Sequence, residues 1–350
     1  MVSIPADILA ADAAGQIPSE ISLEYLAETY DREAIIGIIV LVVVSFVVLI
    51  LRCFARVVLL KRTGIDDLLM VLAMLVYIPI AALCIVLIHM GSGRHFEYIE
   101  YVLPRDTVRR TEVLDFACHI LYANALLFAR LSGLAFYHRV AVLSTKLYYA
   151  IIAAFVFLIA CYLTQLFLLI FHCIPVTDLW PYEWQDEYNS HRCLSWGLVY
   201  SVISAISLVC DFVMFTIPTI MIKGLRVSAR KKLQLSCLLF PGVLVVAIST
   251  TRLYLVVVGQ WSDDGSWAYN AMLAVENAEI AGTLIALSVP ALKPLFVSLF
   301  SRLACLKVLV WNRLSHGSPG EKSNPDGGDD YCKSTPNASR CLLDAGGATV

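Results

Sequence analysis

Long runs of apolar residues, separated by short polar segments, dominate the pattern along the chain. Seven runs are close to the length of about 20 residues that a helix needs to cross the hydrocarbon core of a bilayer. They lie at Ala34–Leu51, Leu68–Ile88, Val113–Phe136, Leu147–Phe171, Leu198–Ile222, Leu235–Val258 and Met272–Phe300. Because the runs do not alternate between polar and apolar positions as barrel strands do, they predict an all-α bundle of seven membrane-spanning helices.

The composition supports a membrane protein. Hydrophobic residues make up 59% of the 350 residues and charged residues only 15%, whereas a soluble domain carries about 25% charged residues. This excludes a water-soluble globular domain and makes membrane lipid the expected surroundings. The net charge of −2 argues against nucleic acid as a partner.

The distribution of Lys and Arg predicts the orientation. The first, third and fifth loops carry eleven of them, and the second, fourth and sixth loops carry five. Cytoplasmic loops are the richer in basic residues. We therefore expect the amino terminus outside and the carboxyl terminus in the cytoplasm, in either the plasma membrane or an endomembrane.

Four segments follow from this topology. Residues 1–33 are an acidic extracellular or lumenal segment, and residues 34–300 form the transmembrane domain. Residues 301–314 keep apolar side chains at helical spacing, which predicts an amphipathic helix on the inner leaflet. Residues 315–350 are rich in Gly, Ser, Pro, Asn and Asp, which predicts a disordered cytoplasmic tail.

Two of the eleven cysteines lie outside the spans on the same expected outer side. Cys173 ends the fourth span and Cys193 precedes the fifth. Because that side is oxidising, we expect a disulfide between them. The alternative is two free thiols.

Ionisable residues inside the spans are the main candidates for function, because each is costly in lipid and needs a partner. Asp211 lies near the middle of the fifth span, and either Arg252 or Arg130 could reach it. Such an internal ion pair is either a switch that holds a resting state or a static pair that allows insertion and packing. The sequence leaves both open.

A second set of polar residues lies near the expected outer ends of two spans. Asp115, His119 and Tyr122 share one face of the third span, at i, i+4 and i+7. Glu276 and Glu279 lie at i and i+3 near the start of the seventh. Together they could line a pocket for a small ligand, or form an interfacial polar rim.

Two acids begin the second span at its cytoplasmic end. Asp66 and Asp67 follow Gly64, where carboxylates suit a helix amino terminus. They could instead contact cytoplasmic basic residues.

Several chemistries lack their sequence signals. A retinal Schiff base needs a lysine in the middle of the last helix, but Lys293 lies about eight residues beyond that point, which is about 12 Å along the axis. No histidine cluster, HExxH, P-loop, GxSxG or complete DDxxD motif occurs. We therefore assign no catalytic residue, metal or cofactor, although a membrane enzyme that works with a few carboxylates stays open.

A series of short motifs in a fixed order runs through the spans. It contains Asp66-Asp67, Gly91-Ser92-Gly93-Arg94-His95, Arg130-Leu131-Ser132, Cys173-Ile174-Pro175 with Trp180, Cys193, Asp211, Arg252-Leu253, Glu276 with Glu279, and Pro290 with Lys293-Pro294. In order and spacing this series resembles the fungal rhodopsin-like domain family of integral membrane proteins. The resemblance covers about residues 34–302. Arg130 stands where members usually have lysine, so the charge is kept.

The resemblance implies a seven-helix membrane protein without implying a pigment. The family includes receptor-like proteins of filamentous fungi and membrane proteins encoded in mycotoxin gene clusters, such as the satratoxin cluster. Two functions therefore compete. One is a receptor-like protein that senses a small ligand and signals to a cytoplasmic protein. The other is a membrane component of a secondary-metabolite pathway that handles or modifies an apolar intermediate.

Overall fold

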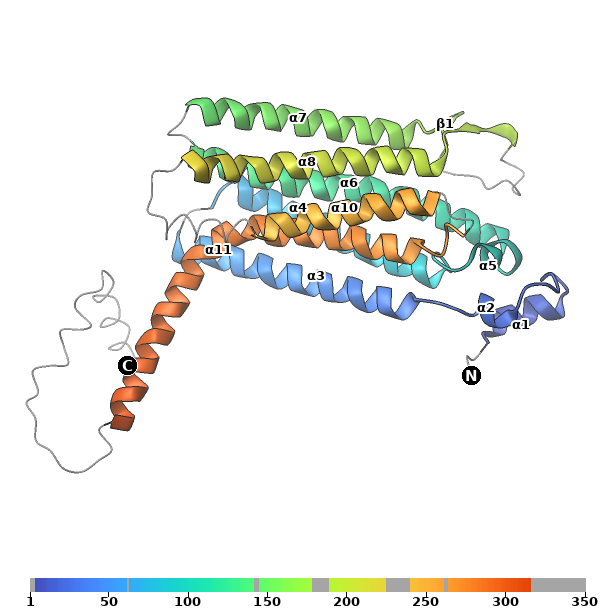
Figure 1. The fold of residues 1–350 in the computed structure, drawn as a ribbon, viewed down its shortest axis with the longest axis horizontal. Helices are drawn as coiled ribbons and strands as arrows, with labels where there is room; N and C mark the ends of the chain where they lie inside the picture. Colours follow the sequence, from blue (N-terminus) through green and yellow to red (C-terminus); the bar gives the residue numbers. More distant parts are fainter. Residues whose placement is uncertain are drawn as a thin grey trace, which may run out of the picture. The chain divides into compact units, whose positions relative to one another are not determined.

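Seven helices of the described chain are long and apolar enough to cross a membrane. The computed structural model describes residues 4–61, 63–141, 145–177, 189–224, 240–260 and 264–315. The seven helices are α3 (Asp31–Phe54), α4 (Ile65–His89), α6 (Arg105–Ala141), α7 (Thr145–Ile170), α8 (Trp196–Gly224), α10 (Phe240–Gln260) and α11 (Tyr269–Ser315) (Figure 1). This confirms the predicted all-α, multi-pass membrane protein. The orientation of the termini stays a prediction.

The remaining elements are short. Helices α1 (Ala6–Ala13) and α2 (Leu23–Leu26) precede the bundle, a π-helix, Ala55–Leu59, continues α3, and α5 (Phe96–Tyr101) follows α4. Strands β1 (Cys173–Ile174) and β2 (Arg192–Cys193) pair antiparallel. Residues 316–350, most of the expected disordered tail, lie outside the described residues.

The chain divides into two units, Met1–Leu295 and Phe296–Val350. The first holds the bundle. The described part of the second is the continuation of α11 to Ser315, which includes the residues of the expected amphipathic helix, 301–314. The location of that segment on the membrane surface stays a prediction.

Helix α6 joins the two largest apolar clusters of the bundle. One cluster packs α3, α4, α6 and α11 around residues such as Tyr77 and Leu126, and the other packs α6, α7 and α8 around Leu134. The packing against α6 is close, because a Cβ added to Gly133 would lie 2.7 Å from the side chains of Leu287 and Met214.

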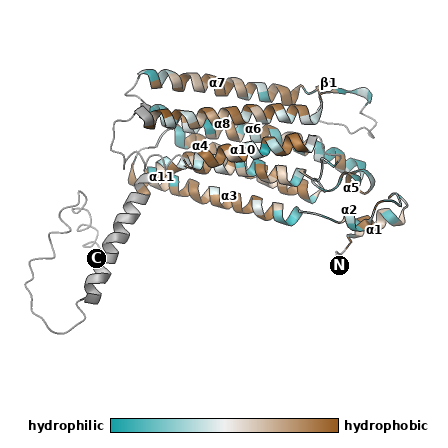
Figure 2. Cartoon of the chain, in the orientation of Figure 1, coloured by the Kyte–Doolittle hydropathy of each residue, from teal (hydrophilic) through white to brown (hydrophobic). Residues whose placement is uncertain are grey.

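Helices α3, α4 and α7 carry exposed apolar side chains, as lipid contact requires. Figure 2 shows that α3 and α7 are mostly hydrophobic along their lengths. The exposed side chains include Val43 on α3, Leu75 on α4, and Val156 and Phe167 on α7. Exposed apolar surface of this extent would be a liability in water. In a bilayer it is the normal surface of a peripheral helix.

The amino-terminal segment and two loops pack together at one end of the bundle. The ring of His95 is stacked between Tyr25, at 3.8 Å, and Trp267, at 4.0 Å, and its Nδ1 lies 2.5 Å from Asp264. Tyr98 donates a hydrogen bond to Asp7. Burial is the main cause that raises the pKa of the Tyr98 hydroxyl, and this hydrogen bond raises it further. We call this end of the molecule the amino-terminal end.

Arg94 and Asn270 meet at Asp31 beside this stack. Arg94 Nη2 lies 3.3 Å from Asp31 and Asn270 Nδ2 lies 3.0 Å from it. Gly93, between Arg94 and the end of α4, has a φ of +85°, and an added Cβ would lie 2.2 Å from the Asn270 amide oxygen. Glycine at this position is therefore required by both backbone conformation and space.

Cys173 and Cys193 are paired across β1 and β2 and form a disulfide. This confirms the bridge expected from the sequence. It joins the end of α7 to the start of α8. Trp180, which lies between the two cysteines in sequence, is outside the described residues.

We predict that Cys193→Ser lowers the free energy of unfolding by about 3 kcal/mol, because the bridge closes a loop with a sequence separation of 20. The measurement is the thermal unfolding midpoint of the purified protein in detergent. Cys53→Ser, which changes a free, half-buried thiol of α3, is the matched control. Equal midpoints for the two variants would contradict the prediction.

Candidate functional site

Two arginines and two carboxylates are paired inside the bundle. Arg130 lies 2.8 Å from Asp211, and Arg252 lies 3.0 Å from Glu279. The two pairs are joined because Arg130 Nη2 is also 3.5 Å from Glu279. None of the four residues is more than 5% exposed. Their formal charges cancel, which allows them to be buried together.

Three hydroxyl groups complete this set of interactions. Tyr122 donates to Glu279 at 2.8 Å, and Ser249 donates to Asp211 at 2.5 Å. Ser207 accepts from Arg130 at 2.6 Å and donates to Glu279 at 2.9 Å. We call these residues the central network; its members are Tyr122, Arg130, Ser207, Asp211, Ser249, Arg252 and Glu279.

A second cluster lies one helical turn nearer the amino-terminal end. His119 Nε2 is 3.3 Å from Glu276, and its Nδ1 is 3.2 Å from Asp115. Tyr269 donates a hydrogen bond to Asp115, and the hydroxyl of Tyr200 lies 3.5 Å from the other oxygen of that carboxylate. We call these five residues the acid–histidine cluster.

The acid–histidine cluster carries excess negative charge. It has two carboxylates, and its one imidazole can supply at most one positive charge. Neither carboxylate contacts a lysine or arginine in the part of the chain that the structure describes. A positively charged or donor-rich group would therefore complement this cluster.

The spacing of α6 and α11 explains why the two clusters lie one above the other. His119 and Tyr122 are three residues apart on α6, as Glu276 and Glu279 are on α11. Residues at this spacing share a face of a helix, one turn apart. The pairs His119–Glu276 and Tyr122–Glu279 are thus successive contacts between the same two helices.

A third cluster lies at the opposite end of the bundle. Arg52 contacts Asp67 at 3.1 Å and Asp66 at 3.2 Å, and Arg56 contacts Asp66 at 3.1 Å. Arg139 of α6 also pairs with Asp66. We call these five residues the arginine cluster. Asp67 additionally accepts from the Gly64 amide at 3.3 Å, so capping and basic contacts, the two alternatives for these acids, both occur.

Two hydrogen bonds to main-chain carbonyls connect the arginine cluster to α11 and α6. Arg52 Nη1 donates to the carbonyl of Leu287 in α11 at 2.8 Å. Ser132 of α6 donates to the carbonyl of Asp66 at 2.5 Å. Pro290 lies one turn further along α11, where it removes a backbone donor from the helix. The side chain of Pro294 lies outside the described residues.

The structure divides the residues of the expected pocket between two clusters. Asp115, His119 and Glu276 lie together, whereas Tyr122 and Glu279 belong to the central network. Of the two cations expected near Asp211, Arg130 pairs with it, and Arg252 pairs with Glu279.

Sequence reasoning missed the serine partners of these ions. Ser207 precedes Asp211 by four residues, and Ser249 precedes Arg252 by three, so both serines share a helix face with an ion. Tyr269 precedes Glu276 by seven residues, which also places them on one face, whereas Tyr200 lies on a helix with no other member of its cluster. The other motif residues lie elsewhere: Gly91 and His95 follow α4, and Pro175 follows β1. In the described residues, no three His, Cys, Asp or Glu side chains are arranged to hold a metal ion.

Comparison with known proteins gives one family. A model of the fungal rhodopsin domain matches residues 51–298. A "SAT4 family membrane protein" of Emericella nidulans is 30% identical over 214 residues, which cover 61% of this chain and 52% of that protein. "Wortmanamides biosynthesis cluster protein C" of Talaromyces wortmannii is 25% identical over 266 residues, 74% of this chain and 67% of that protein. The chain thus spans about half the length of the first relative. No solved structure matches.

We predict that Arg252→Met and Glu279→Gln each lower the free energy of unfolding by about 3–5 kcal/mol, because each leaves a buried charge with too few partners. The double variant removes both charges, and we expect it to lose less than the sum of the single losses. The measurement is unfolding of the purified protein in mixed micelles.

Thr250→Val is the matched control for these variants, because Thr250 is exposed on the helix of Arg252 and, among the described residues, its side chain bonds only the carbonyl of Val246. It should unfold as the wild type does. Losses that simply add in the double variant would show that the two residues are not energetically paired.

Proposed function

The chain belongs to the fungal rhodopsin domain family, and from this premise we propose that it is a receptor-like membrane protein that senses a small molecule. The ligand contacts the acid–histidine cluster, and the central network transmits its binding to the arginine cluster. What supports this is one observation: α6 has residues in all three clusters, and α11 has residues in two and accepts a hydrogen bond from Arg52 of the third.

The contributions of α6 follow its length. It supplies Asp115 and His119 to the first cluster, Tyr122 and Arg130 to the second, and Arg139 to the third. A rotation or shift of α6 would therefore change contacts in all three clusters at once.

Helix α11 makes matching contacts. Glu276 pairs with His119, Glu279 pairs with Arg252, and the carbonyl of Leu287 accepts from Arg52. Because packed helices move between discrete arrangements, two helices that meet at His119–Glu276 and at Tyr122–Glu279 form an element that a ligand can bias. The ligand must bind one arrangement more tightly than the other.

The charge of the acid–histidine cluster limits the ligand class. Its excess negative charge favours a small molecule with a protonated amine or several hydrogen-bond donors. The cluster lies toward the amino-terminal end, which the distribution of basic residues predicts to be outside. The signal would then reach the cytoplasmic end, where a signalling protein is the expected partner.

A second candidate function is a membrane component of a biosynthetic pathway that handles or modifies an apolar intermediate. What favours it is the name of one relative, "Wortmanamides biosynthesis cluster protein C". The same buried carboxylates would then act as proton donors and acceptors.

We predict that Asp211→Asn changes the transcript profile of the source organism, by raising basal output or by abolishing the response, without stalling one defined metabolite. The reason is that the substitution removes the charge that pairs with Arg130 at 2.8 Å. The measurement compares metabolites and transcripts of wild-type, deletion, Asp211→Asn and Thr250→Val strains, with the membrane level of each variant checked by immunoblot.

The two candidate functions give different results in this experiment. Loss of one metabolite, with its precursor accumulating and the pathway genes still expressed, would favour the pathway component and contradict sensing. A wild-type transcript profile in a strain that contains normal amounts of the Asp211→Asn protein would contradict the hypothesis that Asp211 is part of a switch.

A further inference from the structure

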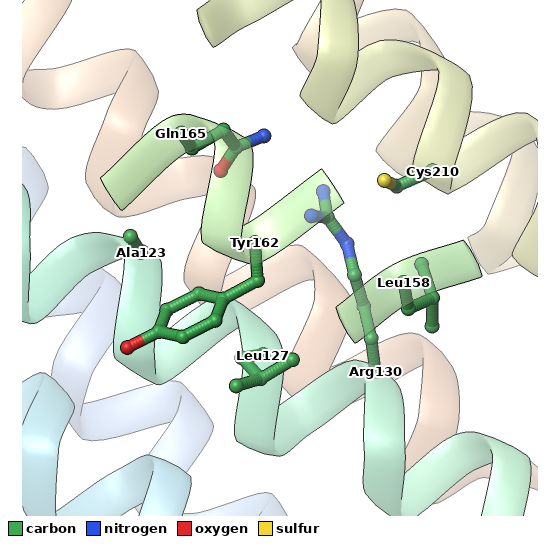
Figure 3. Close-up of a pocket in the computed structure, with 7 residues that line it drawn as sticks. All are labelled: Ala123, Leu127, Arg130, Leu158, Tyr162, Gln165 and Cys210. Carbon is green, nitrogen blue, oxygen red and sulfur yellow. The ribbon is translucent and has the colours of Figure 1, made fainter. Parts of the chain in front are cut away.

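A small cavity lies between α6, α7 and α8, separate from the acid–histidine cluster (Figure 3). Its volume is about 10 Å³, which is the room that one water-sized group needs. Polar and apolar side chains surround it. They are Ala123, Leu127 and Arg130 of α6, Leu158, Tyr162 and Gln165 of α7, and Cys210 of α8.

The cavity arises where two helix faces of the same spacing oppose each other. The α6 residues lie at i, i+4 and i+7, and the α7 residues repeat that spacing. Each set therefore forms one stripe along its helix. Because α6 and α7 run in opposite directions, Arg130 lies beside Leu158 and Gln165 beside Ala123, and the guanidinium of Arg130 extends toward Gln165 (Figure 3).

Two polar groups at the cavity have unused hydrogen-bonding capacity. Gln165 is 7% exposed and makes no hydrogen bond among the described residues. Arg130 uses Nε and Nη2 for Asp211, Ser207 and Glu279, and its Nη1 makes no hydrogen bond there either. By contrast, the Tyr162 hydroxyl already donates to Asn124 at 3.0 Å. Buried polar groups normally have partners, so the amide and the Nη1 group point to a ligand.

The charge balance restricts what that ligand is. The central network already pairs two arginines with two carboxylates, so an added anion would leave the network with excess negative charge. A neutral oxygen, by contrast, accepts from Arg130 and Gln165 without changing the charge. Neutral acceptors of this kind are hydroxyl and carbonyl groups.

The size of the cavity restricts the ligand further. Room for one water-sized group means that the body of the molecule must lie outside the bundle. Helix α7 packs on α6 and α8, and its other sides carry exposed apolar residues such as Val156, Leu163 and Phe167. The molecule therefore has an apolar body that lies along α7 in lipid.

We propose that the cavity between α6, α7 and α8 binds the terminal hydroxyl or carbonyl group of a neutral, lipid-soluble molecule that enters from the bilayer. Arg130 Nη1 and the Gln165 amide donate to its oxygen. This inference does not rest on the proposed sensing function, since the site is distinct and binding is measured directly. It does place a ligand against Arg130, a member of the central network.

The test uses the full chain in phosphatidylcholine vesicles and two photoreactive probes of equal length, a diazirine-bearing decanol and the same molecule without its hydroxyl group. Crosslinked residues are located by peptide mass spectrometry. We expect the probe with the hydroxyl group to label the Leu158–Gln165 segment. An excess of decanol or 2-decanone should displace this probe, and an excess of decane should not. Gln165→Leu should reduce labelling about tenfold, the effect of one lost hydrogen bond.

Thr164→Val is the matched control, because Thr164 is exposed on the same helix and should not affect labelling. Equal labelling by the two probes, or labelling that decanol does not displace, would overturn the proposal. Labelling by neither probe would show that the cavity holds only water, which overturns it as well. If Gln165→Leu fails to fold, displacement in the wild type decides the question by itself.

Discussion

Inside a bilayer, a charged side chain is tolerated only if another group in the protein neutralises it, and the interior of this bundle depends on that constraint. A charge near the bilayer centre costs about 2.5–3.5 kcal/mol on insertion scales. Here Arg130, Asp211, Arg252 and Glu279 cancel one another's charge. Because the four lie on four different helices, their pairing fixes the mutual rotation of α6, α8, α10 and α11 more narrowly than apolar contacts alone would. Side-chain hydroxyls then supply the remaining hydrogen bonds.

The same constraint separates the helices by role. Helix α6 carries polar side chains in all three clusters and α11 in two, and these are the two most buried of the seven spanning helices. Helix α7 carries no ionised residue within its spanning face and presents apolar side chains to lipid. Movement of α6 against α11 therefore changes the ionic contacts, whereas α7 can move at lower cost. The cavity at Gln165 lies beside α7, which makes no ionic contact among the described residues, and not between α6 and α11.

The sequence was enough to predict the seven helices and the disulfide, because apolar length and the position of Cys173 and Cys193 carry that information directly. It also placed Asp211 within reach of Arg130. It could not decide between Arg130 and Arg252, because that choice depends on how each helix is rotated about its own axis, which packing determines. For the same reason Glu279 was expected at the helix end beside Glu276, although it faces the central network. Gln165 gave no signal at all, since a single amide in an apolar run has no spacing to interpret.

The central claim is that α6 and α11 couple the acid–histidine cluster to the central network. The most direct test is a double-mutant cycle of unfolding free energy in mixed micelles with His119→Gln and Asp211→Asn, two residues in different clusters. Independent sites add to within about 0.5 kcal/mol. If the clusters are coupled, the double variant will depart from the sum of the single variants by clearly more than that. Additivity would contradict the account, because it would show that the two clusters are buried in the same bundle without affecting each other.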